Sequence, residues 1–364
     1  MDKRINVLDG LRGIAVLMVL VQHLIEKFPI LQTSPDNAFA YVLQNYLNFG
    51  RVGVIVFFLI SGYLIPFTLR EGPRAATSFW VSRFFRLYPL YWVSLGLALF
   101  TFTIWPAPYE YSTLDALFNV TMLQTAVGSP NVLEPYWTLF IELIFYVLCV
   151  VAFVARLNRV KQPVYFILFF AAIVAMTSLV SLAGDRVPQG LLQKVSTFGI
   201  YLMIMFFGTF LRTLEMHDAG RGAWLYVLPA IAVALGSYTV ARYGWDFNRL
   251  LSPLSVLFST LFAFAVFLLR DQMAWLLRQS WLVFVGTVSY GLYLFHPITL
   301  HVFDHLLPNK QSFVDFTVLA AAVIVSALIL SYAGYRLLEA PMIEVGKHVR
   351  KRLTQTAKVT STAG

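Results

Sequence analysis

Ten long apolar segments constrain this chain more than any other feature. Each is close to the roughly 20 residues that a helix needs to cross the hydrocarbon core of a bilayer. The chain has 364 residues, of which 59% are apolar and 12% charged, a composition too apolar for a soluble domain. The sequence therefore predicts an all-α, polytopic transmembrane helix bundle with about ten spanning helices. The segments are 11–28, 50–69, 87–105, 137–155, 163–182, 195–211, 223–241, 250–269, 281–302 and 313–335.

The positions of the basic residues predict the orientation of this bundle. If the N-terminus is cytoplasmic and the segments alternate, 20 of the 27 Lys and Arg residues lie inside. The positive-inside rule favours this orientation, which makes both termini cytoplasmic and places the protein in the cell (inner) membrane. Because the topology accounts for the net charge of +9, nucleic-acid binding is not expected. The outer set is Lys27, Arg51, Arg186, Lys194, Arg242, Arg249 and Lys310.

The chain divides into a transmembrane domain at 1–345 and a basic, Thr/Ser/Ala-rich tail at 346–364, which is expected to be disordered. The longest loop is 106–136, on the outer side, with a short amphipathic piece near 112–124. It either caps an outward-facing cavity or simply connects two helices. The single cysteine, Cys149, lies in an apolar run, so we expect neither a disulfide nor a metal site.

The first apolar segment carries two polar residues that are costly in a membrane. We expect it to be a retained helix rather than a cleaved signal. Arg12 and His23 are eleven residues apart, so they share one face of a helix and lie roughly 16 Å apart along its axis. Ionisable residues in spanning helices are usually functional, which makes this helix a candidate for the active site.

Two further ionisable residues lie inside other segments. Depth counting at about 1.5 Å per residue places Glu142 and His296 in the outer half of the membrane with His23, which suggests one shared polar site. Tyr146 lies on the same helix face as Glu142. Structural alternatives stay open: His23 can bond a neighbouring helix, Glu142 can pair with Arg51 or a tyrosine, and His296, before a proline, can mark a helix break.

Two motifs border these segments. Arg83 and Arg86, in RFFRLYPLYW, project from one side of a predicted helix start and suit bidentate contact with phosphates. The alternative is ordinary positive-inside anchoring. In FFLISGYLIP, Ser61 and Gly62 allow close backbone approach to a neighbour or ligand.

Together these segments closely resemble acyltransferase family 3, a family of membrane proteins, over about residues 5–345. Six motifs occur in the family's order on the ten predicted spans. They are LDGLRGIAVLMVLVQH (8–23), FFLISGYLI (57–65), RFFRLYPLYW (83–92), WTLFIELIFY (137–146), VSYGLYLFHP (288–297) and RLLEAP (336–341).

The resemblance implies a role for each matched residue. His23 corresponds to the family's essential first-helix histidine and Arg12 to the arginine of that helix. Arg83 and Arg86 correspond to the pair associated with acyl-CoA. The remaining matches are Ser61, Gly62 and Tyr63 in the small-residue motif and Glu142 at an acidic position; the role of His296 stays open, and Tyr146 joins it as a candidate substrate-binding or structural residue.

The resemblance also implies an activity. Members typically move an acyl group, often acetyl, from acyl-CoA as donor substrate to a hydroxyl of a glycan, a lipid-linked sugar or a small metabolite. No permanently bound cofactor is expected; the expected partners are acyl-CoA, the hydroxyl acceptor and membrane lipid, and a homo-oligomer stays open. Some members carry an additional hydrolase-like domain, so a partner protein that completes the transfer also stays open.

The mechanism predicted from these residues places Arg83 and Arg86 on the donor's phosphates and His23 as general base on the acceptor hydroxyl, with Glu142 orienting the imidazole. An acyl-histidine intermediate stays open. Two other classes of protein are a proton-coupled transporter or glycan flippase, in which the intramembrane His and Glu relay protons, and a non-catalytic scaffold.

Overall fold

The computed structural model describes residues 3–27, 46–72, 74–107, 110–184, 188–217, 221–243, 251–308 and 312–362. Within these ranges the regular structure is helical; nine of the ten predicted apolar segments each coincide with one α-helix, and the segment 281–302 coincides with two. The prediction of an all-helical chain is therefore confirmed. Pro29, which closes the first predicted segment, lies outside the described residues.

Eight helical segments of the described chain are long and apolar enough to cross a membrane by themselves. A helix can satisfy its own backbone hydrogen bonds in lipid, which explains why such apolar runs fold this way. The number of spans and the side of each terminus stay predictions. The eight contain α1 (Lys3–Glu26), α4 (Phe49–Leu64), α5 (Ala75–Ile104), α7 (Tyr136–Val154), α8 (Gln162–Ala183), α9 (Gln189–Met216), α10 (Trp224–Tyr243) and α15 (Phe313–Gly334).

Two predicted spans have a different form. Segment 281–302 is broken into α13 (Ser280–Thr287) and α14 (Ser289–Leu306), which meet at an angle of 73°. The bend lies at Val288, whose φ of −95° and ψ of 8° leave the helical region, whereas α14 continues through Pro297. The helix break considered at His296 is therefore absent. Helix α11 (Leu251–Leu268) is apolar over Ser255–Leu268, which is shorter than a full span.

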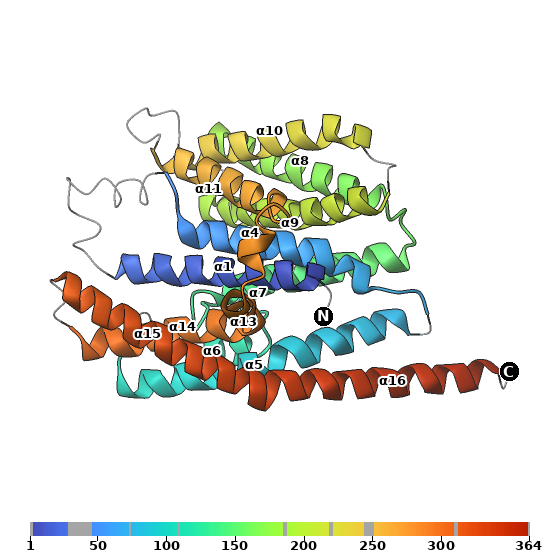
Figure 1. Ribbon diagram of the computed structural model, residues 1–364. Helices are drawn as coiled ribbons and strands as arrows, with labels where there is room; N and C mark the ends of the chain where they lie inside the picture. The colour runs from blue at the N-terminus through green and yellow to red at the C-terminus, as the bar shows by residue number, and fades with distance from the viewer. Residues whose placement is uncertain are drawn as a thin grey trace. The chain divides into compact units, whose positions relative to one another are not determined.

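The described chain forms two compact units, of which the first comprises Met1–Ile25, Leu31–Phe67 and Ile144–Val283. Helix α9 lies at the core of this unit. Of the most apolar stretch of α9, 72% of the residues are buried, against 28% for α8 and 22% for α10. Helices α8, α9 and α10 lie side by side (Figure 1). Large apolar side chains of α8 and α10, such as Met176 and Leu225, are exposed and suit contact with lipid.

Two glycines allow α4 and α9 to cross closely. A Cβ atom on Gly62 would overlap the backbone carbonyl of Met205, and one on Gly208 would overlap that of Leu59. Small residues at such a crossing let two backbones pack directly, the usual basis of helix association in membranes. The structure thus contains the close approach that the small-residue motif predicts.

The second unit comprises Glu26–Ile30, Thr68–Leu143 and Phe284–Gly364. Its helices α14 and α15 pack together, and α15 continues through a π-helical turn (Tyr335–Glu339) into α16 (Ala340–Thr362), which packs along α5 (Figure 1). The tail for which disorder was expected is thus helical to Thr362. Docking on α5 gives a physical reason, since a Cβ on Gly346 would touch the Phe85 side chain.

The long loop of this unit folds back along α5. Its helix α6 (Thr113–Val120) begins with a capping box between Ser112 and Asp115. Tyr88, Tyr91 and Trp92 of α5 donate hydrogen bonds to the backbone carbonyls of Thr121, Asn119 and Val120, at 3.0, 2.5 and 2.9 Å. These three side chains lie 12 to 16 residues before the end of α5, or roughly 18–24 Å by helical rise. The loop therefore folds back along α5, and we call its residues 112–131 the re-entrant segment. That it caps an outward-facing cavity or simply connects two helices stays a prediction.

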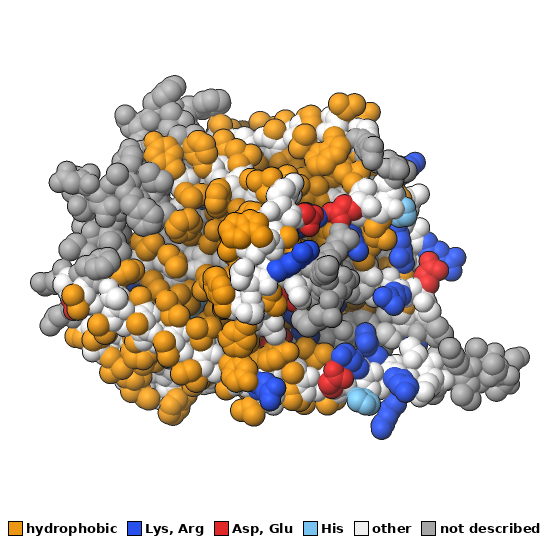
Figure 2. Space-filling view, viewed as in Figure 1, with side chains coloured by type: hydrophobic (Ala, Val, Ile, Leu, Met, Phe, Trp, Pro, Cys, Tyr) orange, Lys and Arg blue, Asp and Glu red, His pale blue; other side chains and the backbone are white. Residues whose placement is uncertain are grey.

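On the face that Figure 2 shows, hydrophobic side chains cover large areas, while charged side chains occur in small groups. Apolar residues of the re-entrant segment, such as Leu114, Leu117 and Leu123, are about half exposed. Such a surface is unfavourable in water and suits a lipid environment.

Candidate functional site

Arg12 and His23 lie on one unbroken helix, α1, so their predicted common face is retained. Arg12 Nη1 donates to Asp9 Oδ1 at 2.8 Å, one turn earlier, and both side chains are partly buried. His23 is half-buried beside the buried Gln22, whose Oε1 accepts a hydrogen bond from the backbone N–H of Phe49 at 3.1 Å. The histidine end of α1 is thereby tied to the start of α4.

Tyr63 of the small-residue motif belongs to a charged cluster that the sequence analysis did not identify. Its hydroxyl, fully buried, donates to Glu215 Oε2 at 2.5 Å and accepts from Arg212 Nη1 at 3.1 Å. Arg270 Nη2 donates to Glu215 Oε1 at 2.5 Å. One signal was present in the sequence: Arg212 and Glu215 are three residues apart at the end of an apolar segment, as an ion pair on one helix face requires.

Arg83 and Arg86 lie in the third and fourth turns of α5, because this helix begins at Ala75 rather than near residue 87. Residues 75–86 contain neither Gly nor Pro, so the helix can extend back from residue 87 to Ala75. Both arginines are half-buried. Arg83 Nη2 donates to Thr68 Oγ1 at 3.2 Å, and its guanidinium carbon lies 5.3 Å from the Phe79 ring centroid.

Glu142 and His296 lie on two antiparallel helices, at different levels. The Thr138 hydroxyl of α7 is 2.9 Å from that of Tyr293 on α14. Glu142 follows Thr138 by one turn in one direction, and His296 follows Tyr293 by nearly one turn in the other. Their levels along the helices therefore differ by roughly 10 Å. His296 is buried, with Nδ1 3.0 Å from the carbonyl oxygen of Leu292.

An uncharged hydrogen-bond network surrounds this region. Ser94 Oγ is 2.9 Å from the Tyr136 hydroxyl and donates to the Leu294 carbonyl at 3.2 Å. The Tyr290 hydroxyl donates to the Leu87 carbonyl at 2.8 Å and interacts electrostatically with Glu142 and Glu339. Glu339, in RLLEAP, is buried in the π-helical turn.

His301 lies in the last turns of α14 and is buried, with its ring 5.1 Å from that of Phe102 and 4.5 Å from that of His305. Aromatic packing, which its place in the sequence does not reveal, explains the burial.

The predicted site residues fall in both units. Arg12, His23, Ser61, Gly62, Tyr63 and Tyr146 belong to the first, and Arg83, Arg86, Glu142 and His296 to the second. That the two sets form one active site stays a prediction. Within the described residues, no three His, Cys, Asp or Glu side chains gather in a way that could hold a metal ion.

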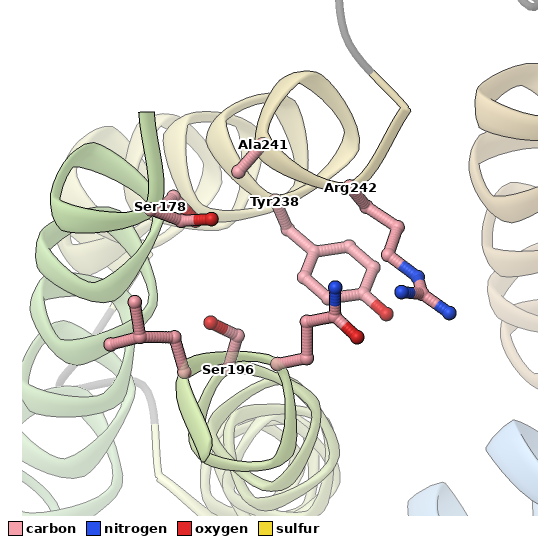
Figure 3. A pocket seen from close by; sticks show the side chains of 8 residues that line it. Ser178, Ser196, Tyr238, Ala241 and Arg242 are labelled. Carbon is pink, nitrogen blue, oxygen red and sulfur yellow. The ribbon is translucent and has the colours of Figure 1, made fainter. Parts of the chain in front are cut away.

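A small pocket lies in the first unit, between the ends of α8, α9 and α10 (Figure 3). The hydroxyls of Ser178 and Ser196 point into it, with Tyr238 and Arg242 beside them. Its empty volume of about 230 Å³ includes open solvent, so the enclosed part is small. No predicted site residue lines it, so it suits a single small polar group rather than the reacting substrates.

Comparison with known proteins gives matches over most of the chain. A family model described as an acyltransferase domain matches residues 5–336. A Staphylococcus aureus protein named "putative O-acetyltransferase" is 26% identical over 93% of this chain and 57% of its own length. The acyltransferase MdmB of Streptomyces mycarofaciens is 29% identical over 39% of this chain and 38% of its own length.

A Bacillus subtilis protein named "putative peptidoglycan O-acetyltransferase" is 28% identical over 49% of this chain and 29% of its own length. The chain thus spans little more than half the length of these relatives, or less. No solved structure matches.

Proposed function

Because this chain belongs to acyltransferase family 3, we propose that it is a membrane O-acyltransferase that moves an acyl group from acyl-CoA to a hydroxyl of an extracytoplasmic or lipid-linked glycan. The observation that carries the proposal is the family match over 5–336, which includes every candidate site residue. Names of relatives that specify O-acetyl transfer, in one case to peptidoglycan, support acetyl as the group and a cell-envelope glycan as the acceptor class.

The donor is held by arginines in this proposal. Arg83 and Arg86 bind phosphates of acyl-CoA at the cytoplasmic face, with both termini on the same side. A planar guanidinium can bind two phosphate oxygens at once, and the two side chains leave one face of α5 three residues apart. Their partial exposure leaves them accessible to a ligand.

Transfer depends on a proton acceptor. His23 removes the proton from the acceptor hydroxyl as its oxygen attacks the thioester carbonyl, and CoA leaves as the thiol after it receives a proton. An imidazole suits this role because its usual pKa is near working pH. Glu142 orients the imidazole or stabilises its charged form, and Arg12, eleven residues away on the same helix, lies along the donor's path.

The first test is His23→Ala, measured as transfer of labelled acetyl from acetyl-CoA to the envelope glycan. Loss of a general base is expected to lower the rate about 10²–10⁴-fold. His348→Ala is the matched control, because His348 is exposed on α16 and bonds only to its own helix. An unchanged rate at normal protein level would refute the assignment of His23.

The donor site is tested by the double variant Arg83→Ala, Arg86→Ala. Affinity for acetyl-CoA is expected to fall by about 10-fold or more, since two charge-assisted phosphate contacts are lost. Lys351→Ala with Arg352→Ala removes the same charge from exposed positions of α16 and serves as control. Equal affinity in both double variants would contradict the proposed role of the pair.

A proton-coupled transporter or flippase is a second candidate, favoured by the 73° break between α13 and α14, since broken helices line many transport sites. Mass spectrometry separates the two. An acyltransferase adds an acetyl mass to the surface glycan, whereas a flippase changes the amount of glycan exported but not its mass.

A further inference from the structure

The charged cluster of the first unit contains Tyr63, Arg212, Glu215 and Arg270, at the C-terminal ends of α4, α9 and α11. None of the three charged residues is needed by the transfer mechanism above. Maintaining two guanidiniums and a carboxylate beside apolar helices is costly, so their partners determine what the cluster can do.

Glu215 and Arg270 satisfy one another. One carboxylate oxygen of Glu215 accepts from Arg270 and the other from the Tyr63 hydroxyl. Arg270 also donates to the Phe267 carbonyl at 3.0 Å, and its side chain is only 7% exposed. Asp271 lies 3.7 Å from Arg270 but is 72% exposed, so solvent screens its charge. Because the described acceptors of Arg270 and both oxygens of Glu215 are already engaged, the pair leaves little capacity for a ligand.

The Arg212 guanidinium has fewer described protein acceptors than it has N–H donors. Within the described part of the chain its polar contacts are both made through Nη1, to Tyr63 at 3.1 Å and to Glu215 at 3.8 Å. Its side chain is 24% exposed. Nη2 and Nε therefore have no protein acceptor among the described residues, although the Glu215–Arg270 pair lies beside them.

Aromatic packing holds this guanidinium in place. Its central carbon lies 5.0 Å from the ring centroid of Tyr63 and 5.9 Å from that of Phe67. A cation near a helix C-terminus is favourable by itself, which accounts for an arginine at this position. It does not account for a guanidinium that is held by the Tyr63 hydroxyl and two aromatic rings while its Nε and Nη2 donors have no described acceptor. An arginine that binds an anion through two parallel N–H groups has this arrangement.

We propose that Arg212 binds a phosphate group through Nε and Nη2, and that Tyr63, Glu215 and Arg270 are positioning residues for it. Two sources carry this chemistry: the phosphates of acyl-CoA and the headgroup of an anionic phospholipid. In the first case the site rests on the proposed function and adds to its donor contacts; in the second it is independent of that function.

The test uses the full chain purified into phosphatidylcholine nanodiscs, with Arg212→Gln, Arg212→Lys and the matched control Arg278→Gln. Arg278 is an exposed arginine of the same unit outside the cluster. One arm measures the Kd of CoA. Pantetheine, which lacks the phosphates of CoA, is the control ligand in this arm. The other arm measures the rise in thermal midpoint when phosphatidylglycerol is added to the nanodisc.

Arg212→Gln is expected either to raise the Kd of CoA about 10- to 100-fold or to abolish most of the rise in thermal midpoint with phosphatidylglycerol. Arg212→Lys, which keeps the charge but not the fork, should have a smaller effect in the same arm. A change in the CoA arm alone supports the donor phosphate, and a change in the lipid arm alone supports the headgroup. If Arg212→Gln matches Arg278→Gln in both arms, the proposal is overturned. This outcome is distinct from failure of the proposed function, which the His23→Ala assay measures.

Discussion

Two regions of this protein bury polar groups among apolar helices in contrasting ways. In the second unit, Tyr88, Tyr91 and Trp92 donate to backbone carbonyls of the re-entrant segment. In the first unit, Tyr63 joins two guanidiniums and a carboxylate. Both arrangements avoid unpaired polar groups, which are costly away from water.

The two arrangements differ in the number of hydrogen-bond donors that stay available to a ligand. The neutral network uses its donors to bind carbonyls at the C-terminal end of α6, where a helix lacks partners for its last carbonyl groups, so its capacity serves the fold. The charged cluster contains more guanidinium donors than its buried acceptors can use, so its capacity is available to a ligand. The uncharged network thus indicates a structural role, and the excess of positive charge in the cluster indicates binding of an anionic ligand.

The largest effect should come from breaking the charged cluster. Glu215→Gln leaves Arg270, 7% exposed, without its carboxylate. Breaking a buried pair costs about 3–5 kcal/mol, and the 34% exposure of Glu215 lowers our expectation to about 2 kcal/mol of unfolding free energy. Thermal or denaturant unfolding in detergent measures this loss.

The matched control is Glu344→Gln. Glu344 pairs with Lys347 on the exposed face of α16, and an exposed pair contributes about 0–1 kcal/mol. Equal stability of the two variants would show that Glu215 contributes no more than a surface carboxylate and would remove the contrast between the regions.

A smaller effect is expected from the neutral network. Asn119 is fully buried, and its side chain donates to the carbonyls of Asp115 and Pro130 and accepts from the N–H of Val132. Asn119→Ala removes the side-chain partner of these backbone groups and should lower stability by about 1 kcal/mol, the lower end of the cost of an unpaired buried group. Donor binding is not expected to change beyond what the loss of stability explains.

Thr103→Ala controls for the loss of a hydrogen bond as such, because the exposed Thr103 hydroxyl bonds only to its own helix. Unfolding of both variants under the same conditions gives the comparison. An Asn119 variant as stable as the Thr103 variant would contradict a structural role for the re-entrant segment.

The smallest effect is local and depends on pH. Hydrogen bonds from Ser129 and Ser112 lower the pKa of Asp115 below its ordinary value. A lowered pKa means that the ionised carboxylate stabilises the fold above about pH 4, and that this contribution disappears as pH falls through the folded pKa. The protection factors of amides in residues 112–131, which are corrected for the intrinsic pH dependence of exchange, should therefore fall in acid.

Asp115→Asn should remove this acid dependence. Asp315→Asn changes an identical capping box, Ser312 with Asp315, at the start of α15 and should leave exchange in 112–131 unchanged. If the protection factors in 112–131 still fall in acid in Asp115→Asn, another group causes the effect.

The sequence alone predicted the elements of the fold well. Each apolar segment of about 20 residues became helical, because a backbone in lipid must satisfy its own hydrogen bonds. The six motifs, including the first-helix Arg12 and His23, led to the family that the comparison then matched over residues 5–336. These are local properties of composition, spacing and motif.

Other features were decided only by the tertiary structure. Tyr63, Glu215 and Arg270 are far apart in the chain, and the α4–α9 crossing at Gly62 and the packing of α11 bring them together. The return of 112–131 along α5 likewise depends on three side chains finding carbonyls about 30 residues later. Helical periodicity shows which face a residue occupies but not which distant group it meets, because partner choice is set by packing between elements rather than within one.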